Sequence, residues 1–140
     1  MSRDEILQFI NSNPTCCLAT SENDQPHVRV IGIYRADKNG IIFQTWKKKD
    51  LYRQIQANSD IEICFSNQEK DKQIRVKGKV VINKDEYLKK EIIEARPFLK
   101  PWIEKMRLDM LVVLTVVECQ ACVWTFEINF TQKEYIKITT

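Results

Sequence analysis

The sequence predicts an α+β domain that is mainly antiparallel β, with a small barrel at its centre and a few peripheral helices. Short alternating or β-branched segments follow one another along most of the 140 residues, with turn-forming residues between them. Segments with helical periodicity occur at only a few points. No linker or internal repeat divides the chain, so one domain over residues 1–140 is expected.

The first element is predicted to be a short helix. Ser2 and Glu5 have the spacing of a capping box. Three apolar residues then share one helical face, namely Ile6, Phe9 and Ile10. These signals predict a helix over residues 3–11, which Asn13-Pro14 would end.

Three strands should follow. Alternating residues predict strands over 15–20 and 27–34, with a polar turn between them. The sequence Asp-Lys-Asn-Gly at 37–40 is a hairpin signal, because its glycine can adopt positive φ, and it leads into a strand over 41–45. The strands over 27–34 and 41–45 are therefore expected to be adjacent and antiparallel.

The middle of the chain predicts one helix and a pair of strands. Residues 48–57 form the helix, in which Leu51 and Ile55 are spaced to pack inward. An antiparallel pair is predicted over 61–66 and 73–82, across a polar loop.

The last third begins with another predicted helix. Asn83 and Glu86 repeat the capping pattern and predict a helix over 84–95. Two prolines then predict a bend or short helical turn at 97–101. The remaining apolar segments predict three strands, at residues 110–117, 121–128 and 135–138.

The join between the strand over 41–45 and the next helix is suited to an anion. The strand ends in the hydroxyl of Thr45, and a helix N-terminus presents free N–H groups and the positive end of its dipole. The lysines at 47–49 would oppose that dipole in a first helical turn, and a bound phosphate would remove the conflict. Two other readings stay open: Thr45 as a simple N-cap, and the lysines as a solvated helix face.

Arg29 is a candidate for the same anion. It lies among valines and isoleucines in the strand over 27–34, and its planar fork offers paired donors to a phosphate. If the two strands are adjacent, Arg29 and Thr45 can lie at one sheet edge. An ordinary outward-facing arginine on a half-exposed strand is the alternative.

Nucleic acid is a second kind of polyanion to consider. A basic stripe with a stacking tryptophan could form from Trp46 and the residues Lys47, Lys48, Lys49, Arg53, Arg75, Lys77 and Lys79. Against this stand 19 acidic residues and a net charge of only +3. A single-stranded nucleic-acid-binding module therefore remains only an alternative.

Other chemistries find little support in the residue types. His27 is the only histidine, which excludes metal sites built on several imidazoles. Cys119 and Cys122 form an isolated C-x-x-C, and no second pair is present to complete a zinc site. No residue stands out as a general acid or base, so no catalytic side chain is assigned. The polar N-terminus and the lack of a long apolar run lead us to expect a cytoplasmic protein without a membrane span.

With these segments assembled, the chain resembles the flavin-binding split-barrel superfamily of pyridoxamine 5′-phosphate oxidases, in particular its short single-domain members. The resemblance covers nearly the whole chain. It rests on C-C-L-A-T (16–20), P-H-V-R-V-I-G-I-Y (26–34), F-Q-T-W-K-K-K-D-L-Y-R-Q-I-Q-A-N-S-D-I-E-I-C-F (43–65), Q-I-R-V-K-G-K-V-V-I (73–82) and A-C-V-W-T (121–125).

The resemblance implies an FMN-binding split β-barrel and a homodimer with the cofactor at the subunit interface. Its implied phosphate ligands are Arg29, Thr45 and one or both of Lys48 and Lys49. The ring and ribityl chain would lie along Val30, Ile31 and Gln44. Gln73 would contact the flavin from the second subunit, and Trp124 is a candidate to cover the ring.

The resemblance further implies a flavin-dependent oxidoreductase acting between reduced nicotinamide, NAD(P)H, and a small acceptor. The full-length oxidases carry substrate-holding residues that have no match in residues 83–105 or in the tail, so vitamin B6 oxidation is not implied. The usual Ser-Arg-Lys order at the strand-to-helix junction is also absent. A binder of a related cofactor, deazaflavin or haem, is the alternative within the same fold.

Overall fold

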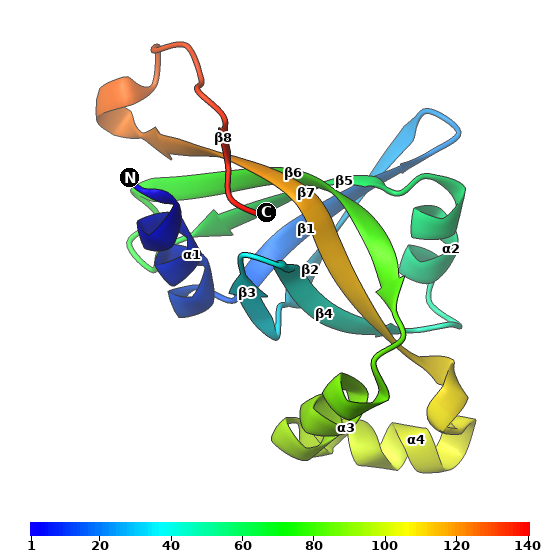
Figure 1. The fold of residues 1–140 in the computed structure, drawn as a ribbon. Helices are drawn as coiled ribbons and strands as arrows, with labels where there is room; N and C mark the ends of the chain where they lie inside the picture. Colours follow the sequence, from blue (N-terminus) through cyan, green and yellow to red (C-terminus); the bar gives the residue numbers. More distant parts are fainter.

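The computed structural model describes residues 1–140 and confirms the α+β class, with one antiparallel sheet and four α-helices (Figure 1). The strands are β1 (Thr15–Glu22), β2 (Gln25–Gly32), β3 (Arg35–Asp37), β4 (Gly40–Trp46), β5 (Asp60–Ser66), β6 (Lys72–Asn83), β7 (Leu111–Thr125) and β8 (Ile136–Lys137). The helices are α1 (Arg3–Ser12), α2 (Asp50–Ala57), α3 (Glu86–Ala95) and α4 (Lys100–Met106). None of them is both long enough and apolar enough to cross a membrane.

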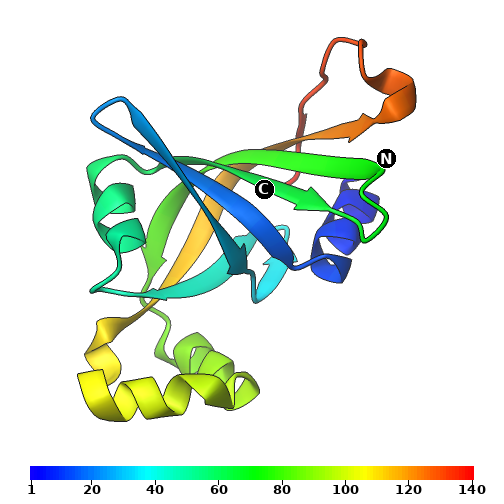
Figure 2. The ribbon, with the colours of Figure 1, turned by 180° about the vertical axis from the view of Figure 1, so that it is seen from behind.

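The sheet curls into a barrel because of the connection between β2 and β3. The strand order is β2-β1-β5-β6-β7-β4-β3, so β2 and β3 lie at opposite ends. Only Ile33 and Tyr34 join them, which forces the two ends of the sheet together (Figures 1 and 2). Here the Ile33 amide donates to the Pro14 carbonyl at 3.0 Å, and the Tyr34 amide donates to Ile42 at 2.7 Å.

The barrel is split where these ends meet. The ladder partner of β2 is β1, and those of β4 are β3 and β7, so no ladder joins β2 to β4. The expectation that the strands of Arg29 and Thr45 are adjacent and antiparallel was therefore wrong. The residues at 33 and 34 break the predicted long strand, and the chain passes from one end of the sheet to the other before β4 begins.

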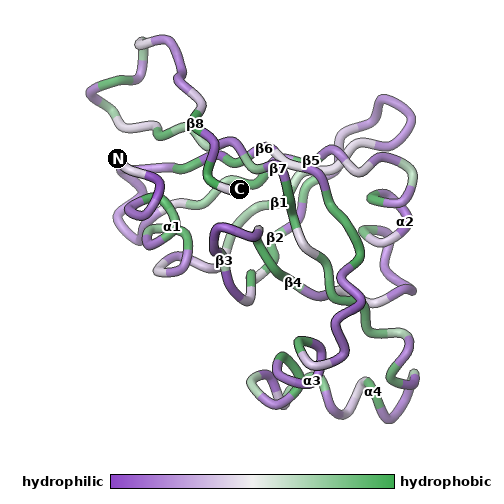
Figure 3. The backbone as a smooth tube through the Cα atoms, in the orientation of Figure 1, coloured by the Kyte–Doolittle hydropathy of each residue, from purple (hydrophilic) through white to green (hydrophobic).

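Two hydrophobic clusters stabilise the fold. The main cluster fills the barrel with fully buried side chains that include Leu18, Phe43, Ile63, Phe65 and Ile74, and Ile6 and Ile10 of α1 close one end of it. The second cluster joins α3 and its neighbours to the barrel through Ile42, Leu88, Ile92, Leu99, Leu111 and Val113. Figure 3 shows the hydrophobic course of β7 through the middle of the molecule, with hydrophilic segments at the turns.

The helix N-termini follow the sequence signals in one of three cases. The capping box of α1 is confirmed: the Glu5 amide donates to Ser2 Oγ at 3.1 Å, and the Ser2 amide donates to Glu5 Oε1 at 3.0 Å. For α3, however, the N-cap is Asp85, whose carboxylate accepts from the amides of Tyr87 and Leu88. An aspartate directly before the first turn displaced the predicted start at residue 84.

The helix α2 starts at Asp50, two residues later than predicted, with Lys49 as its N-cap. The three lysines therefore lie before the helix and not in its first turn, which contains Asp50 instead. The predicted conflict between first-turn lysines and the helix dipole does not arise.

The two strands predicted over 110–117 and 121–128 form one strand, β7, ending at Thr125. The residues between them, 118–120, form a β-bulge. It is visible as a shift in the register with β6 between Lys77 and Lys79. Glu118 adopts positive φ at this bulge, and Gly78 packs against it from β6. A Cβ at Gly78 would lie 2.9 Å from the Val117 carbonyl oxygen and 2.6 Å from Val116 Cγ1.

We therefore expect Gly78→Ala to lower the free energy of unfolding by about 1–3 kcal/mol, because the new methyl group meets backbone that cannot move away easily. Gly32→Ala is the matched control, since no atom lies within 4 Å of a Cβ at that position. Chemical denaturation measures both. Equal stability of the two variants would show that the bulge is not closely packed.

Candidate cofactor-binding site

A cavity of about 400 Å³ lies in the seam of the split barrel, between β2, β4 and the start of α2. Its walls bring together six of the nine predicted site residues: Arg29, Val30, Ile31, Gln44, Thr45 and Lys49. The others around it are His27, Val28, Asp50 and Leu51. The curling of the sheet thus places residues of β2 and β4, which do not pair with each other, around one cavity.

The side chain of Arg29 is held by a partly buried polar network. Its Nη1 donates to Thr20 Oγ1 at 2.8 Å and to the Leu18 carbonyl at 3.4 Å, and its Nη2 donates to Gln54 Oε1. Burial lowers the pKa of the Arg29 guanidinium, while the Asp50 carboxylate opposes that shift. The group stays charged because the ordinary pKa of arginine is far above neutral.

Thr45 has the most unusual environment in the molecule. Its side chain is 3% exposed, and its Oγ1 is the only buried side-chain nitrogen or oxygen without a hydrogen-bond partner. It does not act as an N-cap, since Lys49 occupies that position of α2. A buried hydroxyl without a partner costs about 1–3 kcal/mol, and Thr45 lines the cavity, so a hydrogen-bonding ligand bound there would relieve this cost.

The start of α2 contributes charges of both signs. Lys49 lines the cavity and Lys48 does not, so only Lys49 is placed to contact an anion there. Asp50 also lines it, and its Oδ1 accepts from the Leu51 amide at 2.9 Å. The N-terminus of α2 adds the positive end of the helix dipole at this point, although the amides of Leu51 and Tyr52 already have acceptors within the chain.

Gln44 is engaged by an arginine that the sequence did not single out. Arg96 follows α3, and its Nη1 donates to Gln44 Oε1 at 2.8 Å while its Nη2 donates to the Ile33 carbonyl at 2.7 Å. This pairing fixes the orientation of Gln44 and ties the helices to the seam. No local pattern marks Arg96, because its partners are more than 50 residues away.

Thr20 and Gln54 were also missed. Gln54 lies three residues after Leu51 and one before Ile55, so it belongs to the inward face of α2, and it is 1% exposed. The sequence signal that could have identified Gln54 was its position, because a polar residue is unusual on the inward face of a helix. Thr20, at the end of an apolar strand, gave none.

Gln73 and Trp124 lie away from the cavity, as cross-strand partners near the start of β6 and the end of β7. Gln73 Oε1 accepts a weak bond from Cys64 Sγ at 3.8 Å. Trp124 Nε1 donates to Asn129 Oδ1 at 2.8 Å, and its ring meets that of Phe126 edge-on. Within one chain neither residue reaches the cavity.

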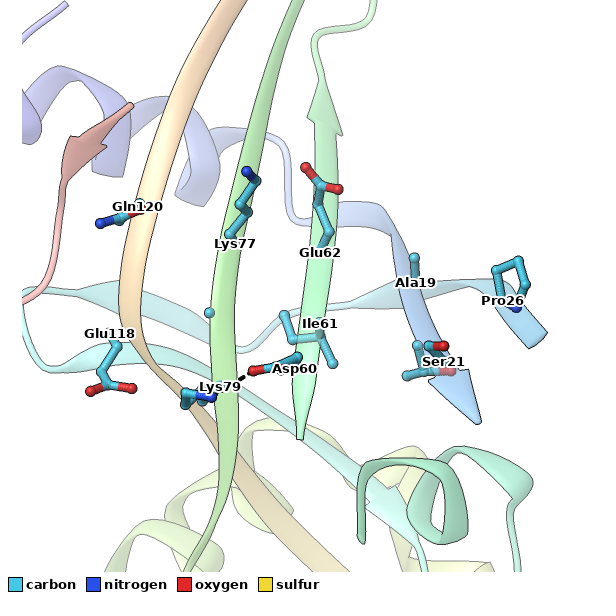
Figure 4. Close-up of a pocket in the computed structure, with 12 residues that line it drawn as sticks. Ala19, Ser21, Pro26, Asp60, Ile61, Glu62, Lys77, Lys79, Glu118 and Gln120 are labelled. Atoms are coloured by element: carbon cyan, nitrogen blue, oxygen red, sulfur yellow. Dashed lines mark hydrogen bonds and ion pairs between the residues drawn. The ribbon is translucent and has the colours of Figure 1, made fainter. Parts of the chain in front are cut away.

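A larger hollow, of about 690 Å³, lies over β1, β5, β6 and β7. Figure 4 shows Glu62, Lys77 and Gln120 extending from neighbouring strands, with Lys79 paired to Asp60 at 2.7 Å. No buried polar atom in it lacks a partner. The smaller seam cavity is the better candidate site, because it combines an unpartnered buried hydroxyl with a partly buried cation that has no ion pair.

Two residues of the suggested nucleic-acid stripe are held in ion pairs, Arg53 with Glu22 and Lys79 with Asp60. Trp46 is partly buried against the second hydrophobic cluster, which limits the surface that it offers to a base.

The cysteines of the C-x-x-C are both buried, and Cys119 packs in the main cluster. Burial raises the pKa of the Cys119 thiol to about 12. This thiol is therefore not poised for redox or metal chemistry.

Comparisons with known proteins agree with this architecture. A structure described as a NimC/NimA family protein from Clostridium acetobutylicum is 25% identical, with a TM-score of 0.76 over 97% of this chain and 93% of that one. General stress protein 26 from Bacillus anthracis is 18% identical, with a TM-score of 0.72 over 96% and 97%. A FAD-binding protein from Mesorhizobium loti is 15% identical, with a TM-score of 0.66 over 88% and 94%.

No functionally curated protein sequence matches the chain. The sequence profile of one family, described as pyridoxamine 5′-phosphate oxidase, matches residues 2–118. This match spans most of the chain and includes every wall of the seam cavity. The chain belongs to the pyridoxamine 5′-phosphate oxidase family.

Proposed function

We propose that this protein binds FMN, with the phosphate in the seam cavity, and acts as a flavin-dependent oxidoreductase on a small substrate. The observation that carries the proposal is the Thr45 hydroxyl, which is buried beside a cavity and has no partner in the protein. A phosphate oxygen would accept its hydrogen bond.

The charges around the cavity fit a phosphate. Arg29 and Lys49 supply two cations, and the N-terminus of α2 supplies the positive end of its dipole, against the one carboxylate of Asp50. The Asp50 carboxylate already accepts a hydrogen bond from the Leu51 amide at the helix N-terminus. The positive end of the helix dipole therefore compensates part of its negative charge. A flavin phosphate is a dianion with several acceptor oxygens, and it can use all of these donors.

The cavity walls next to the phosphate site suit the rest of FMN. Val30 and Ile31 of β2 offer apolar surface, and Gln44 offers a fixed amide. These residues would lie along the ribityl chain and the ring. Family membership and a structural relative described as FAD-binding also support a flavin.

The outer face of the sheet suggests where a second subunit would pack. Val28 and Val30 are 71% and 67% exposed, and Cys17 is exposed beside them on β1. Cys17 is paired with Cys64, which contacts Gln73, so Gln73 belongs to the same face. A homodimer formed through this face would bring Gln73 of the partner subunit toward the flavin.

In this proposal the flavin supplies the chemistry and the protein supplies binding and orientation. When bound, the flavin supplies the transfer of a hydride or electrons between reduced nicotinamide and the acceptor. The chain binds and orients the cofactor and covers part of it from water. We assign no catalytic residue.

The visible spectrum of the purified protein tests this proposal. We expect a flavin absorption band that co-elutes with the protein on gel filtration, or that returns after FMN is added. A colourless protein that FMN does not reconstitute would contradict the proposal, and a Soret band would favour haem instead.

Arg29→Ala should weaken FMN binding by about 1.5–3 kcal/mol, because it removes a charge-assisted pair of hydrogen bonds. Titration of apoprotein with FMN measures the change. Arg53→Ala is the matched control, since Arg53 is an exposed arginine of α2 that pairs with Glu22, and its loss should change affinity by less than about 0.5 kcal/mol. Equal losses in the two variants would mean that Arg29 acts only through net charge.

Thr45→Val should weaken FMN binding about tenfold while the stability of the apoprotein holds or rises by up to about 1 kcal/mol, because the variant removes an unpartnered buried hydroxyl. Thr115→Val provides the contrast. The hydroxyl of Thr115 accepts from Asn83 Nδ2 at 3.0 Å, so its removal should cost about 1 kcal/mol of stability. A large loss of apoprotein stability in Thr45→Val would show that its hydroxyl has a partner within the protein.

A further inference from the structure

All protein groups that hold Arg29 are electrically neutral. They are the Leu18 carbonyl, the Thr20 hydroxyl and the Gln54 amide oxygen. Arg29 takes part in none of the ion pairs of the molecule, although Arg35, Arg53 and Arg107 each have an acidic partner. The positive charge at the seam is thus fixed in place without a direct ion pair, and the Asp50 carboxylate on the same cavity wall acts on it only from a distance.

Gln54 is the centre of this arrangement. It lies on the inward face of α2 between Leu51 and Ile55, where a polar amide is costly unless it is hydrogen-bonded. Its Oε1 accepts from Thr20 Oγ1 at 2.6 Å and also from Arg29 Nη2. Thr20 Oγ1 in turn accepts from Arg29 Nη1, so the three side chains close a triangle.

In this triangle the guanidinium of Arg29 only donates, the amide oxygen of Gln54 only accepts, and the Thr20 hydroxyl does both. The Thr20 hydroxyl has one proton, which goes to Gln54, and lone pairs that accept from Arg29. A carboxylate at position 54 would hold the guanidinium equally well, but it would cancel the charge. An apolar residue there would leave only Leu18 and Thr20 to hold Arg29 through Nη1, so the side chain would be less ordered and ordering it on binding would cost free energy.

We propose that Gln54, together with Thr20, is a neutral clamp that positions Arg29 and makes the site selective for phosphorylated flavin over riboflavin. The inference rests on the proposed function and concerns one part of it, recognition of the phosphate. Gln54 is a positioning residue: it acts through Arg29 and not through its own contact with the cofactor.

The experiment compares the affinities for FMN and riboflavin, which differ only in the phosphate. Wild-type protein should bind FMN more tightly. Gln54→Glu should lower FMN affinity about 10- to 100-fold, since the new carboxylate pairs with Arg29 and repels the phosphate. Its riboflavin affinity should stay within about threefold, because a change confined to the phosphate subsite is nearly invisible to a ligand without phosphate.

Two further variants make the result specific. Gln56→Glu adds the same charge on the exposed side of α2, where Gln56 contacts Tyr52, and should leave the FMN-to-riboflavin ratio unchanged. Gln54→Met keeps the side-chain volume but removes the acceptor, and should lower that ratio by about three- to tenfold through loss of positioning. The Met variant also provides the test if the Glu variant does not fold.

The outcomes separate the clamp from the cofactor proposal. If wild-type protein prefers FMN and the Gln54 variants lose FMN and riboflavin affinity equally, Gln54 has only a structural role and the clamp is wrong. Unchanged FMN affinity in both Gln54 variants also overturns it. If wild-type protein binds neither flavin, the proposed function fails and the clamp fails with it.

Discussion

The two-residue connection between β2 and β3 is the constraint on which the rest of the structure depends. It joins strands at opposite ends of the sheet, so the sheet must curl until its ends meet. Because β2 and β4 do not pair, the curling leaves a seam, and α2 begins beside it. The candidate site is this seam. It exists because β2 and β4 come close together but form no backbone hydrogen bonds with each other.

In the proposed function, the residues of the seam serve binding at some cost to stability. The Arg29 guanidinium is partly buried and bonded only to neutral groups, and the Thr45 hydroxyl has no partner. Each is unfavourable in an empty cavity, and each becomes favourable when a phosphate oxygen occupies the space. Such local costs are typical of positions kept for a ligand, and they distinguish the seam from the larger hollow over β5 and β6, whose ion pair is already formed.

Signals within a few residues predicted local structure well, while long-range pairing was not accessible. The capping box of α1 was correct because all its groups lie within four residues. The bulge at Glu118 was read as a strand end, because only its register with Gly78 identifies it. Arg29 and Thr45 were chosen by residue type, and they do line one cavity, although the reason given for their proximity was wrong. Gln54 and Arg96 were missed because their roles come from partners more than 20 residues away, and the contact expected of Gln73 requires a second chain.

A crystal structure of the protein with FMN is the most direct test of the seam as a cofactor site. We expect the phosphate in the seam, with oxygens about 2.7–3.1 Å from Thr45 Oγ1 and from the Arg29 guanidinium. The Arg29, Thr20 and Gln54 side chains should keep the arrangement seen here. FMN bound in the hollow over β5 and β6, or a phosphate that contacts neither Arg29 nor Thr45, would contradict the assignment.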